Sequence, residues 1–271
     1  MLTIYAPSNN PSSKCWRVFN GIKQSWPDEV SIKDNSSFSL PESPAMFWGF
    51  VNNNTQLIHQ LELSGSDYYF TDTPYFGRFD NANLTDTNHY WRICKNRIHA
   101  QFIKDCPDDR LKRFDIKIKE RPKNHGQYIL VCPSSAGMDN YLHETNWLVN
   151  TIADIEQHTD RPIRVRTKPR GNGTSGPSVA KIPIEEDLKD AWACVTSCSI
   201  SAVEALVNGV PVFCHYKSFA KVMGSTDLSE IENPFYTDPS RWLNSLAYQQ
   251  FTPEEYQNGT AVGIMRDIGI L

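Results

Sequence analysis

Hydroxyl and thiol side chains crowd one short turn of this sequence, between a β-like run and a helix. The stretch AWACVTSCSISAVEALVNGVPVFCHY, which starts at Ala191, places TSCSIS where a simple turn would favour Gly, Asn or Pro. Ser197 or Ser199 can cap the helix that follows, and the free N–H groups beyond the cap would form an anion site with the helix dipole. The turn therefore predicts either a phosphate site, which Thr196 would join, or an ordinary helix cap.

A single carboxylate follows this turn within an otherwise apolar helix. Glu204 stands five residues after Ser199, where it would accept two hydrogen bonds from the diol of a ribose whose phosphate is held at the turn. The alternative is an exposed glutamate on an amphipathic helix. We weigh the two interpretations evenly on this stretch alone.

Polar side chains also follow the neighbouring predicted strands. The runs QYILVC (127–132), PIRVRTKP (162–169), ACVTS and VPVFCHY are typical of buried strands, and the segments between them are helical. The carboxyl ends of parallel strands meet at one sheet edge, which is where open α/β sheets bind ligands. We therefore expect a cluster there of Ser134, Ser135, Arg166, Lys168, the TSCSIS turn and His215. Lys168 is equally compatible with a solvated charge at a strand end, and a histidine in the position of His215 is more often a satisfied polar residue than a catalyst.

The alternation of strands and helices predicts an α/β protein with right-handed parallel crossovers. A charged, proline-flanked segment, CPDDRLKRFDIKIKERPKNHG, separates two such halves. We predict two Rossmann-like domains that face one another across a cleft, formed by residues 1–121 and 122–271. Predicted strands are 2–7, SIKD (31–34), 44–50, 67–72 and 89–94, and predicted helices include 14–24, a helix ending at Gly65, and 143–158.

The first half offers a candidate base and candidate acceptor contacts. Asp72 ends the strand DYYFTD and is a candidate general base, with Arg78 in the polar loop beyond it. Basic residues then gather between Arg92 and Lys123, including Lys112, Arg113 and Lys117. This stretch would either contact a nucleic-acid backbone or solvate a linker.

Composition excludes several classes of protein. The 271 residues carry a net charge of −4, and the apolar runs are too short for a membrane span. The N-terminal MLTIYAPSNNPSSK does not have the pattern of a secretory signal, which favours the cytoplasm. The seven cysteines are scattered, without CxxC spacing, and predict reduced thiols and no zinc site.

Several catalytic motifs are absent from the sequence. It does not contain GxxxxGK[ST], and we predict neither a P-loop nor a Rossmann dinucleotide site. The absence of GxSxG argues against a serine nucleophile. No Asp-x-Asp pair occurs either, although metal-dependent sugar transfer commonly uses one. We predict no metal site.

The second half, from about Gln127 to Thr260, resembles the C-terminal domain of GT-B-type glycosyltransferases. The resembling segments are TDRPIRVRTKP, DAWACVTSCSISAVEALVNGVPVF, IENPF and RWLNSLAYQQFTPEEYQNGTA. In that fold, a strand, a serine-rich turn and a helix with Glu recognise a nucleotide-sugar. With YFGRF, YWRI and DDR upstream, the arrangement is also similar to poorly characterised proteins of tailed bacteriophages.

The resemblance implies a metal-independent transferase with a nucleotide-sugar as co-substrate, a UDP-sugar by expectation, and no other cofactor. Ser197 and Ser199 would hold the diphosphate, Glu204 the ribose, and Lys168 with Arg166 the leaving charge. Asp72 and His215 are the predicted catalytic residues. The usual second Glu before the donor-site carboxylate is absent, which favours inversion of stereochemistry.

Three functions stay open on the sequence. The phage resemblance favours transfer to a hydroxymethylated base of double-stranded DNA, in the host cytoplasm, with Arg78, Arg92, Lys112, Arg113 and Lys117 on the acceptor. A transferase acting on polysaccharide or protein is the second. The third is a non-catalytic protein that binds a nucleotide or nucleotide-sugar.

Overall fold

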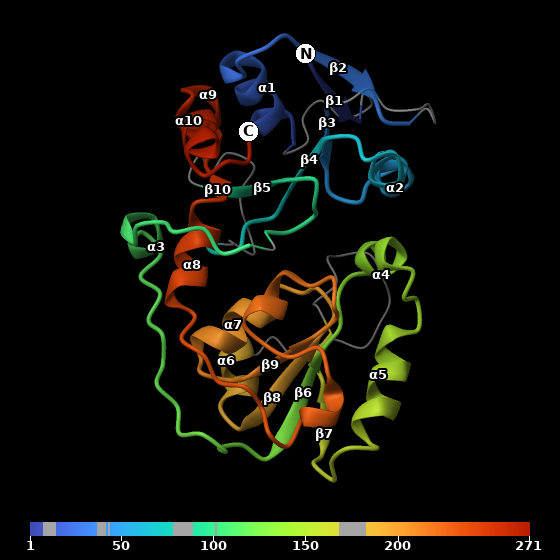
Figure 1. The fold of residues 1–271 in the computed structure, drawn as a ribbon, viewed down its shortest axis with the longest axis vertical. Coiled ribbons are helices and arrows are strands. Elements are labelled where there is room, and N and C mark those ends of the chain that lie inside the picture. The colour runs from blue at the N-terminus through green and yellow to red at the C-terminus, as the bar shows by residue number, and fades with distance from the viewer. Residues whose placement is uncertain (8–14, 37–41, 43, 78–88, 101, 168–182) are drawn as a thin grey trace. The chain divides into compact units, whose positions relative to one another are not determined.

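The computed structural model describes residues 1–7, 15–36, 42, 44–77, 89–100, 102–167 and 183–271 (Figure 1). The chain forms two compact units, and the first is discontinuous. It comprises Met1–Phe114 together with Asn244–Leu271, whereas the second is the continuous segment Asp115–Leu243. The predicted division into 1–121 and 122–271 thus differs from these units chiefly at the C-terminus.

A mixed six-stranded sheet forms the centre of the first unit, in the order β10-β5-β4-β3-β1-β2. Four strands are parallel: β1 (Leu2–Ala6), β2 (Val30–Asp34), β3 (Ala45–Trp48) and β4 (Tyr68–Asp72). The strand expected at 89–94 is β5 (Trp91–Lys95), which runs antiparallel to β4. The last strand, β10 (Gln250–Phe251), comes from the C-terminal segment and pairs with β5.

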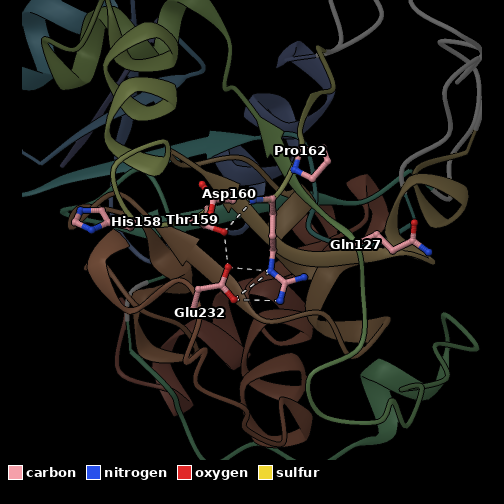
Figure 2. A pocket seen from close by; sticks show the side chains of 7 residues that line it. Gln127, His158, Thr159, Asp160, Pro162 and Glu232 are labelled. Carbon is pink, nitrogen blue, oxygen red and sulfur yellow. Dashed lines mark hydrogen bonds and ion pairs between the residues drawn. The ribbon is translucent and has the colours of Figure 1, made fainter.

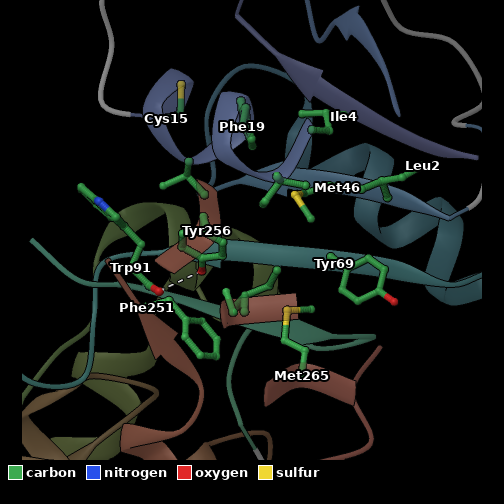
Figure 3. Packing of buried hydrophobic residues seen from close by; sticks show 14 of the residues in the cluster. Leu2, Ile4, Cys15, Phe19, Met46, Tyr69, Trp91, Phe251, Tyr256 and Met265 are labelled. Carbon is green, nitrogen blue, oxygen red and sulfur yellow. Dashed lines mark hydrogen bonds between the residues drawn. The ribbon is translucent and has the colours of Figure 1, made fainter. Parts of the chain in front are cut away.

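Helices from both ends of the chain share the core of this unit (Figure 3). The buried cluster includes Ile4, Phe19, Met46 and Tyr256, from β1, α1 (Cys15–Ser25), β3 and α9 (Pro253–Gln257), while α10 (Thr260–Asp267) adds Met265. The α1 and α9 helices approach so closely that a Cβ on Gly21 would lie 2.9 Å from that of Tyr256. The helix predicted to end at Gly65 is α2 (Asn54–Ser64), and Gly65 caps it in the left-handed conformation, as predicted.

The segment predicted to be a linker is partly structural. It contains α3 (Asp109–Lys112), whose Arg110 is only 2% exposed. The Arg110 guanidinium donates to both oxygens of Glu255, at 2.8 and 2.9 Å, and to the carbonyl oxygens of Ala247 and Gln250. The prediction of a solvated linker is therefore wrong for this part, because a buried ion pair anchors it to the C-terminal segment.

The loop that follows β4 is also held by the C-terminal segment. The buried Gln250 accepts hydrogen bonds through Oε1 from the main-chain N–H groups of Tyr75 and Phe76, at 2.7 and 3.1 Å. Its amide nitrogen donates to the carbonyl oxygen of Phe76 at 3.3 Å. The predicted site residue Asp72 thus precedes a loop whose main chain is fixed from β10.

The sheet of the second unit is entirely parallel, in the order β7-β6-β8-β9. Its strands are β6 (Tyr128–Cys132), β7 (Ile163–Val165), β8 (Ala191–Thr196) and β9 (Val212–Cys214), and β6 and β8 are buried throughout. The helices are α4 (Ala136–Leu142), α5 (Trp147–Ile155), α6 (Ile184–Leu188), α7 (Ser201–Val207), short 3-10 turns at Phe219–Val222 and Leu228–Glu230, and α8 (Ser240–Ala247), which leads back to the first unit.

One predicted helix of this unit is wrong. The stretch 143–158 was expected to be continuous, but α4 ends at His143, which has a left-handed φ of 59°, and α5 begins four residues later. The apolar stripe survives in α5, where Trp147 and Ile155 are buried against Ile129 and Val131. Two α/β units, one with an all-parallel sheet and one with four neighbouring parallel strands in a mixed sheet, confirm the predicted pair of Rossmann-like domains.

Candidate functional site

Two serine-containing turns meet at the carboxyl edge of the second sheet. One follows β6 with Ser134 and Ser135, and the other follows β8 with Thr196 to Ser199. Because β6 and β8 are paired in parallel, the two turns leave the sheet at the same edge. The structure thus brings together the hydroxyl side chains that the sequence predicted to gather there.

Hydrogen bonds join the two turns directly. Ser197 Oγ donates to Ser134 Oγ at 2.5 Å, and Ser134 Oγ accepts from the N–H of Cys198 at 3.0 Å. Thr196 Oγ1 donates to the carbonyl oxygen of Cys132 at 2.7 Å. Ser135 is exposed and caps α4 by accepting from the N–H of Met138. Ser135 is therefore the hydroxyl of this group that is open to a ligand.

The predicted anion site at the start of α7 is not formed as expected. The helix begins at Ser201, and its N-cap is Ile200 rather than Ser197 or Ser199. The N–H of Ser199 donates to Thr196 Oγ1 and that of Ser201 to Ser199 Oγ, at 3.3 and 3.4 Å. Ser197 and Ser199 are also buried. Hydroxyl oxygens of the protein thus accept hydrogen bonds from the N–H groups that were expected to bind a diphosphate.

Glu204 has the surroundings that its sequence position suggested. It is exposed, whereas Ser201, Ala202, Val203, Ala205 and Leu206 of the same helix are buried. Its carboxylate stands one turn along the helix from the serine turn. An exposed carboxylate beside a polar edge suits a ligand hydroxyl pair as well as solvent.

His215 fixes the corner where β9 ends. Its main-chain N–H lies 3.3 Å from the carbonyl oxygens of both Thr196 and Ser197. Its Nδ1 accepts from the N–H of Lys217 at 3.2 Å, and its Nε2 lies 3.6 Å from Glu144. Burial lowers the pKa of the imidazole, although Glu144 opposes this shift. Both ring nitrogens thus face protein groups, which favours a positioning role, and the predicted catalytic role stays untested.

The predicted cations of this edge are placed differently from expectation. Arg166 forms an ion pair with Asp187, and its N–H donates to the carbonyl oxygen of Val131 at 2.9 Å. Its charge is thus balanced within the protein. Lys168 lies outside the described residues.

Asp72 ends β4 in the first unit and is partly exposed. One carboxylate oxygen accepts from the N–H of Thr73 at 2.7 Å, and the other accepts from Arg92 at 3.1 Å. Arg92 itself is buried, and its guanidinium also donates to the carbonyl oxygens of Thr73 and Ile98. Arg92 therefore cannot contact an acceptor, and that prediction is wrong because the side chain is internal.

The other predicted acceptor residues are exposed but paired. Lys112 lies 2.9 Å from Asp108, Arg113 3.2 Å from Glu255, and Lys117 3.9 Å from Asp115. Surface pairs of this kind are weak and exchange with solvent. The basic stretch is thus interleaved with acids rather than a continuous positive surface. Arg78 lies outside the described residues.

A shallow pocket lies at the opposite end of the second sheet (Figure 2). It centres on Glu232, which pairs with Arg161 at 2.9 Å, and the Arg161 guanidinium stacks 3.5 Å over the ring of Trp192. The pocket borders the amino ends of β6 and β7, because Gln127 and Pro162 precede those strands. Its location therefore disfavours a ligand site of the usual α/β kind. The lining residues are Gln127, His158, Thr159, Asp160, Arg161, Pro162 and Glu232.

Sequence reasoning missed Lys217 and Glu144 at the serine-rich edge. Lys217 follows β9 by three residues, and a search of strand ends extended that far would have found it. Glu144 gave no signal, because it follows the unpredicted break between α4 and α5. Within the described residues, no cluster of three His, Cys, Asp or Glu side chains is arranged for a metal ion. Among the described helices, none is both long and apolar enough to span a membrane.

Comparisons with known proteins reveal a likeness of fold. No protein-family model matches the sequence, and a search of curated proteins finds no match. Among solved structures, Thermosulfurimonas dismutans KpsC, a beta Kdo 2,4 transferase, matches with a TM-score of 0.50 and 12% identity over 97% of each chain. The beta Kdo 2,7 transferase of the same organism's KpsC matches with a TM-score of 0.49 and 13% identity over 97% of this chain and 98% of its own. The chain thus has a fold found in a glycosyltransferase.

Proposed function

We propose that this protein is a glycosyltransferase that takes a sugar from a nucleotide-sugar donor. The observation that carries the proposal is the likeness to the beta Kdo 2,4 transferase, which extends over 97% of both chains and so includes both units. The serine-rich carboxyl edge of the second sheet supports it, because this is where α/β sheets bind nucleotides. The finer assignments below rest on the sequence and on local geometry.

The donor would bind at the edge that carries Ser135 and Glu204. The hydroxyl of Ser135 would donate to a phosphate oxygen, and the Glu204 carboxylate would accept from the ribose diol. The hydrogen bond between the half-buried Ser134 and the buried Ser197 would hold the shape of the edge. A UDP-sugar is the expected donor, and protein cations and hydroxyls rather than a metal ion would stabilise the leaving phosphate.

In the proposed reaction, Asp72 takes a proton from an acceptor hydroxyl. The acceptor oxygen then forms a bond to the anomeric carbon of the sugar, while the bond from that carbon to the phosphate oxygen breaks. The electron pair of that bond leaves with the nucleotide. The hydrogen bond from Arg92 would hold the Asp72 carboxylate in position for the first step.

Slow hydrolysis of a donor tests the proposal and separates it from a non-catalytic binding protein. The protein would be incubated with a panel of UDP-, GDP- and CMP-sugars, and free nucleotide would be measured. We expect hydrolysis of one donor class. Saturable binding without hydrolysis or transfer would favour a sensor, and no binding at all would overturn the proposal.

We expect Glu204→Ala to weaken binding of that donor by about 2–4 kcal/mol, since two charge-assisted hydrogen bonds are lost. Calorimetry would measure the affinity. Glu185→Ala is the control, because Glu185 is an exposed glutamate on α6 of the same unit. Equal affinities for wild type and Glu204→Ala would refute the ribose assignment.

The acceptor is proposed to be a glycan rather than DNA. The DNA hypothesis came from the phage resemblance, and the basic stretch that would contact the DNA backbone gives it little support, because Arg92 is internal and the exposed members alternate with acids. We expect no DNA binding at 0.15 M salt, and no effect of replacing Lys112, Arg113 and Lys117 together with Gln, by fluorescence anisotropy. Tight binding whose salt slope falls by about two to three units in the triple variant would restore the DNA acceptor.

The free thiols support a cytoplasmic location. All seven cysteines lie in described parts of the chain and none forms a disulfide. Oxidising compartments favour disulfides in extracellular proteins. We therefore keep the cytoplasm as the proposed location, whether in a bacterium or in a phage-infected host.

A further inference from the structure

Gln250 lies in one row of the first sheet with Arg92 and the candidate base Asp72. In the register of the sheet, Gln250 of β10 is paired with Arg92 of β5, and Arg92 is paired with Asp72 of β4. Gln250 and Arg92 are 0% and 2% exposed, whereas Asp72 is partly exposed. Solvent thus reaches the Asp72 end of the row, and the other two side chains are placed to act on the protein itself.

Arg92 ties Asp72 to the first residue of the loop that follows β4. Its guanidinium donates to one oxygen of the Asp72 carboxylate at 3.1 Å and to the carbonyl oxygen of Thr73. The other carboxylate oxygen accepts from the N–H of Thr73 at 2.7 Å. The ring of Tyr75 lies beside the same guanidinium, with its centroid 5.6 Å from the central carbon. The direction of the Asp72 carboxylate therefore depends on where the main chain from Thr73 to Tyr75 lies.

Gln250 fixes the far end of this loop. Its Oε1 accepts from the N–H groups of Tyr75 and Phe76 at 2.7 and 3.1 Å, and its amide nitrogen donates to the carbonyl oxygen of Phe76 at 3.3 Å. Tyr75 and Phe76 are buried, so a main-chain N–H that loses its acceptor there does not readily find water instead. One side chain thus makes three hydrogen bonds that hold the loop at the end away from Asp72.

The main chain of Gln250 is itself held in place. Its carbonyl oxygen accepts from the guanidinium of Arg110 at 2.8 Å, and the same guanidinium is bidentate to Glu255. Pairing with β5 fixes the strand to which Gln250 belongs. The amide of Gln250 therefore projects from a rigid support toward the loop.

We propose that Gln250 is a positioning residue of the transfer reaction, which sets the place of the Asp72 carboxylate by fixing the loop after β4. This inference rests on the proposed glycosyltransferase function with Asp72 as the general base. Gln250 does not touch the acceptor and acts through Tyr75 and Arg92. A base must lie within hydrogen-bond reach of the acceptor hydroxyl, and a displacement of about 1 Å costs about 100-fold in rate. Loss of the three hydrogen bonds therefore lowers turnover and leaves the donor affinity of the other unit unchanged.

Steady-state kinetics with the donor identified by the hydrolysis panel tests this role. Gln250→Met keeps the length of the side chain but removes its hydrogen bonds, whereas Gln250→Glu keeps an acceptor for the two N–H groups. We expect Gln250→Met to lose about 10-fold or more in kcat, with a donor KM within about twofold of wild type. Gln250→Glu should recover most of that loss. Gln249→Met is the control, because Gln249 is also buried but its amide donates to Ser245 rather than to the loop.

A double variant shows whether Gln250 acts through Asp72. Asp72→Asn removes the base, so a residue that only positions the base has nothing further to lose. We expect Asp72→Asn to turn over at the same rate with and without Gln250→Met. A rate that falls by the product of the two single effects would show that Gln250 acts independently of Asp72, and would overturn the inference.

Hydrogen exchange separates release of the loop from loss of the fold. In Gln250→Met the amides of Tyr75 and Phe76 should exchange faster, while those of β1 and β3 in the same unit stay protected. If Gln250→Met does not fold, Gln250→Asn takes its place in every measurement, because its amide is shorter by one methylene and remains polar. Unchanged exchange of the two loop amides in a folded variant would overturn the inference.

The remaining outcomes separate this inference from the proposed function. Normal kcat in the folded Gln250→Met variant, or an equal loss in Gln249→Met, would overturn the inference while the proposed function stands. Normal kcat in Asp72→Asn would overturn it as well, because Gln250 would then have no base to position. If wild type hydrolyses no donor, the proposed function fails and the inference fails with it.

Discussion

Arg110→Ala should lower the free energy of unfolding by about 3–5 kcal/mol, because it removes the buried partner of Glu255 and leaves only the exposed Arg113 paired with that carboxylate. Arg110 is 2% exposed and bidentate to Glu255, and it also satisfies two main-chain carbonyls. Urea unfolding followed by circular dichroism would measure the change. The midpoint should fall with little change in slope.

Arg113→Ala provides the matched control. Arg113 donates to the same Glu255 oxygen at 3.2 Å but is 46% exposed, so we expect less than about 1 kcal/mol. Equal losses in the two variants would show that burial does not set the strength of this pair. A small loss in Arg110→Ala alone would show that Glu255 readily finds solvent.

The same pair predicts an acid dependence of stability. Burial would raise the pKa of Glu255, but the hydrogen bond and charge of Arg110 outweigh it and hold this pKa below its usual 4.5. A carboxylate whose pKa is lower in the folded than in the unfolded state stabilises the protein at pH values above its unfolded-state pKa. This stabilisation is lost as the pH falls through the folded-state pKa. Wild type should therefore lose stability below about pH 4.5 more steeply than Arg110→Ala does.

The second large effect is expected at Asp72. Asp72→Asn should reduce turnover about 100-fold or more, because it removes the proton acceptor while keeping the size of the side chain. Donor affinity should change little, since the donor is proposed to bind the other unit. Steady-state kinetics with the donor identified by the hydrolysis panel would measure both quantities.

A structural role of Asp72 makes a different prediction. If Asp72 serves only as the counter-ion of the buried Arg92, the variant loses stability but each folded molecule keeps near-normal turnover. Thermal unfolding measured alongside the kinetics separates the two roles. Asp67→Asn is the control, because Asp67 precedes β4 at its other end and pairs with Lys95 on the surface.

Local patterns predicted the parts of this fold that depend on local physics. The apolar runs of β6 and β8 and the C-cap at Gly65 follow from side-chain periodicity and from the backbone freedom of glycine. The polar edge also followed, because parallel strands fix where their carboxyl ends meet. These features needed no knowledge of distant residues.

Long-range partners explain what the sequence could not reveal. Arg110 looked like a linker charge because Glu255 lies 145 residues away. The serines looked like phosphate ligands because nothing local shows that Ser134 bonds to Ser197, 63 residues later. Arg166 looked free for the same reason, since its partner Asp187 lies 21 residues later. The sequence shows which polar side chains are present, but it does not show which of them are already bonded to a distant residue.

The late arrival of Gln250 has a consequence for the order of folding. The loop after β4 is held by Gln250, which lies 175 positions downstream of Tyr75. The same segment supplies β10, the strand that pairs with β5 at the end of the sheet. On the ribosome, therefore, the first unit to begin synthesis is the last to close, whereas Asp115–Leu243 emerges as one piece and can close earlier. Until residues 244–271 emerge, the nascent chain presents β5 as an unpaired strand edge, which is prone to pair with another chain.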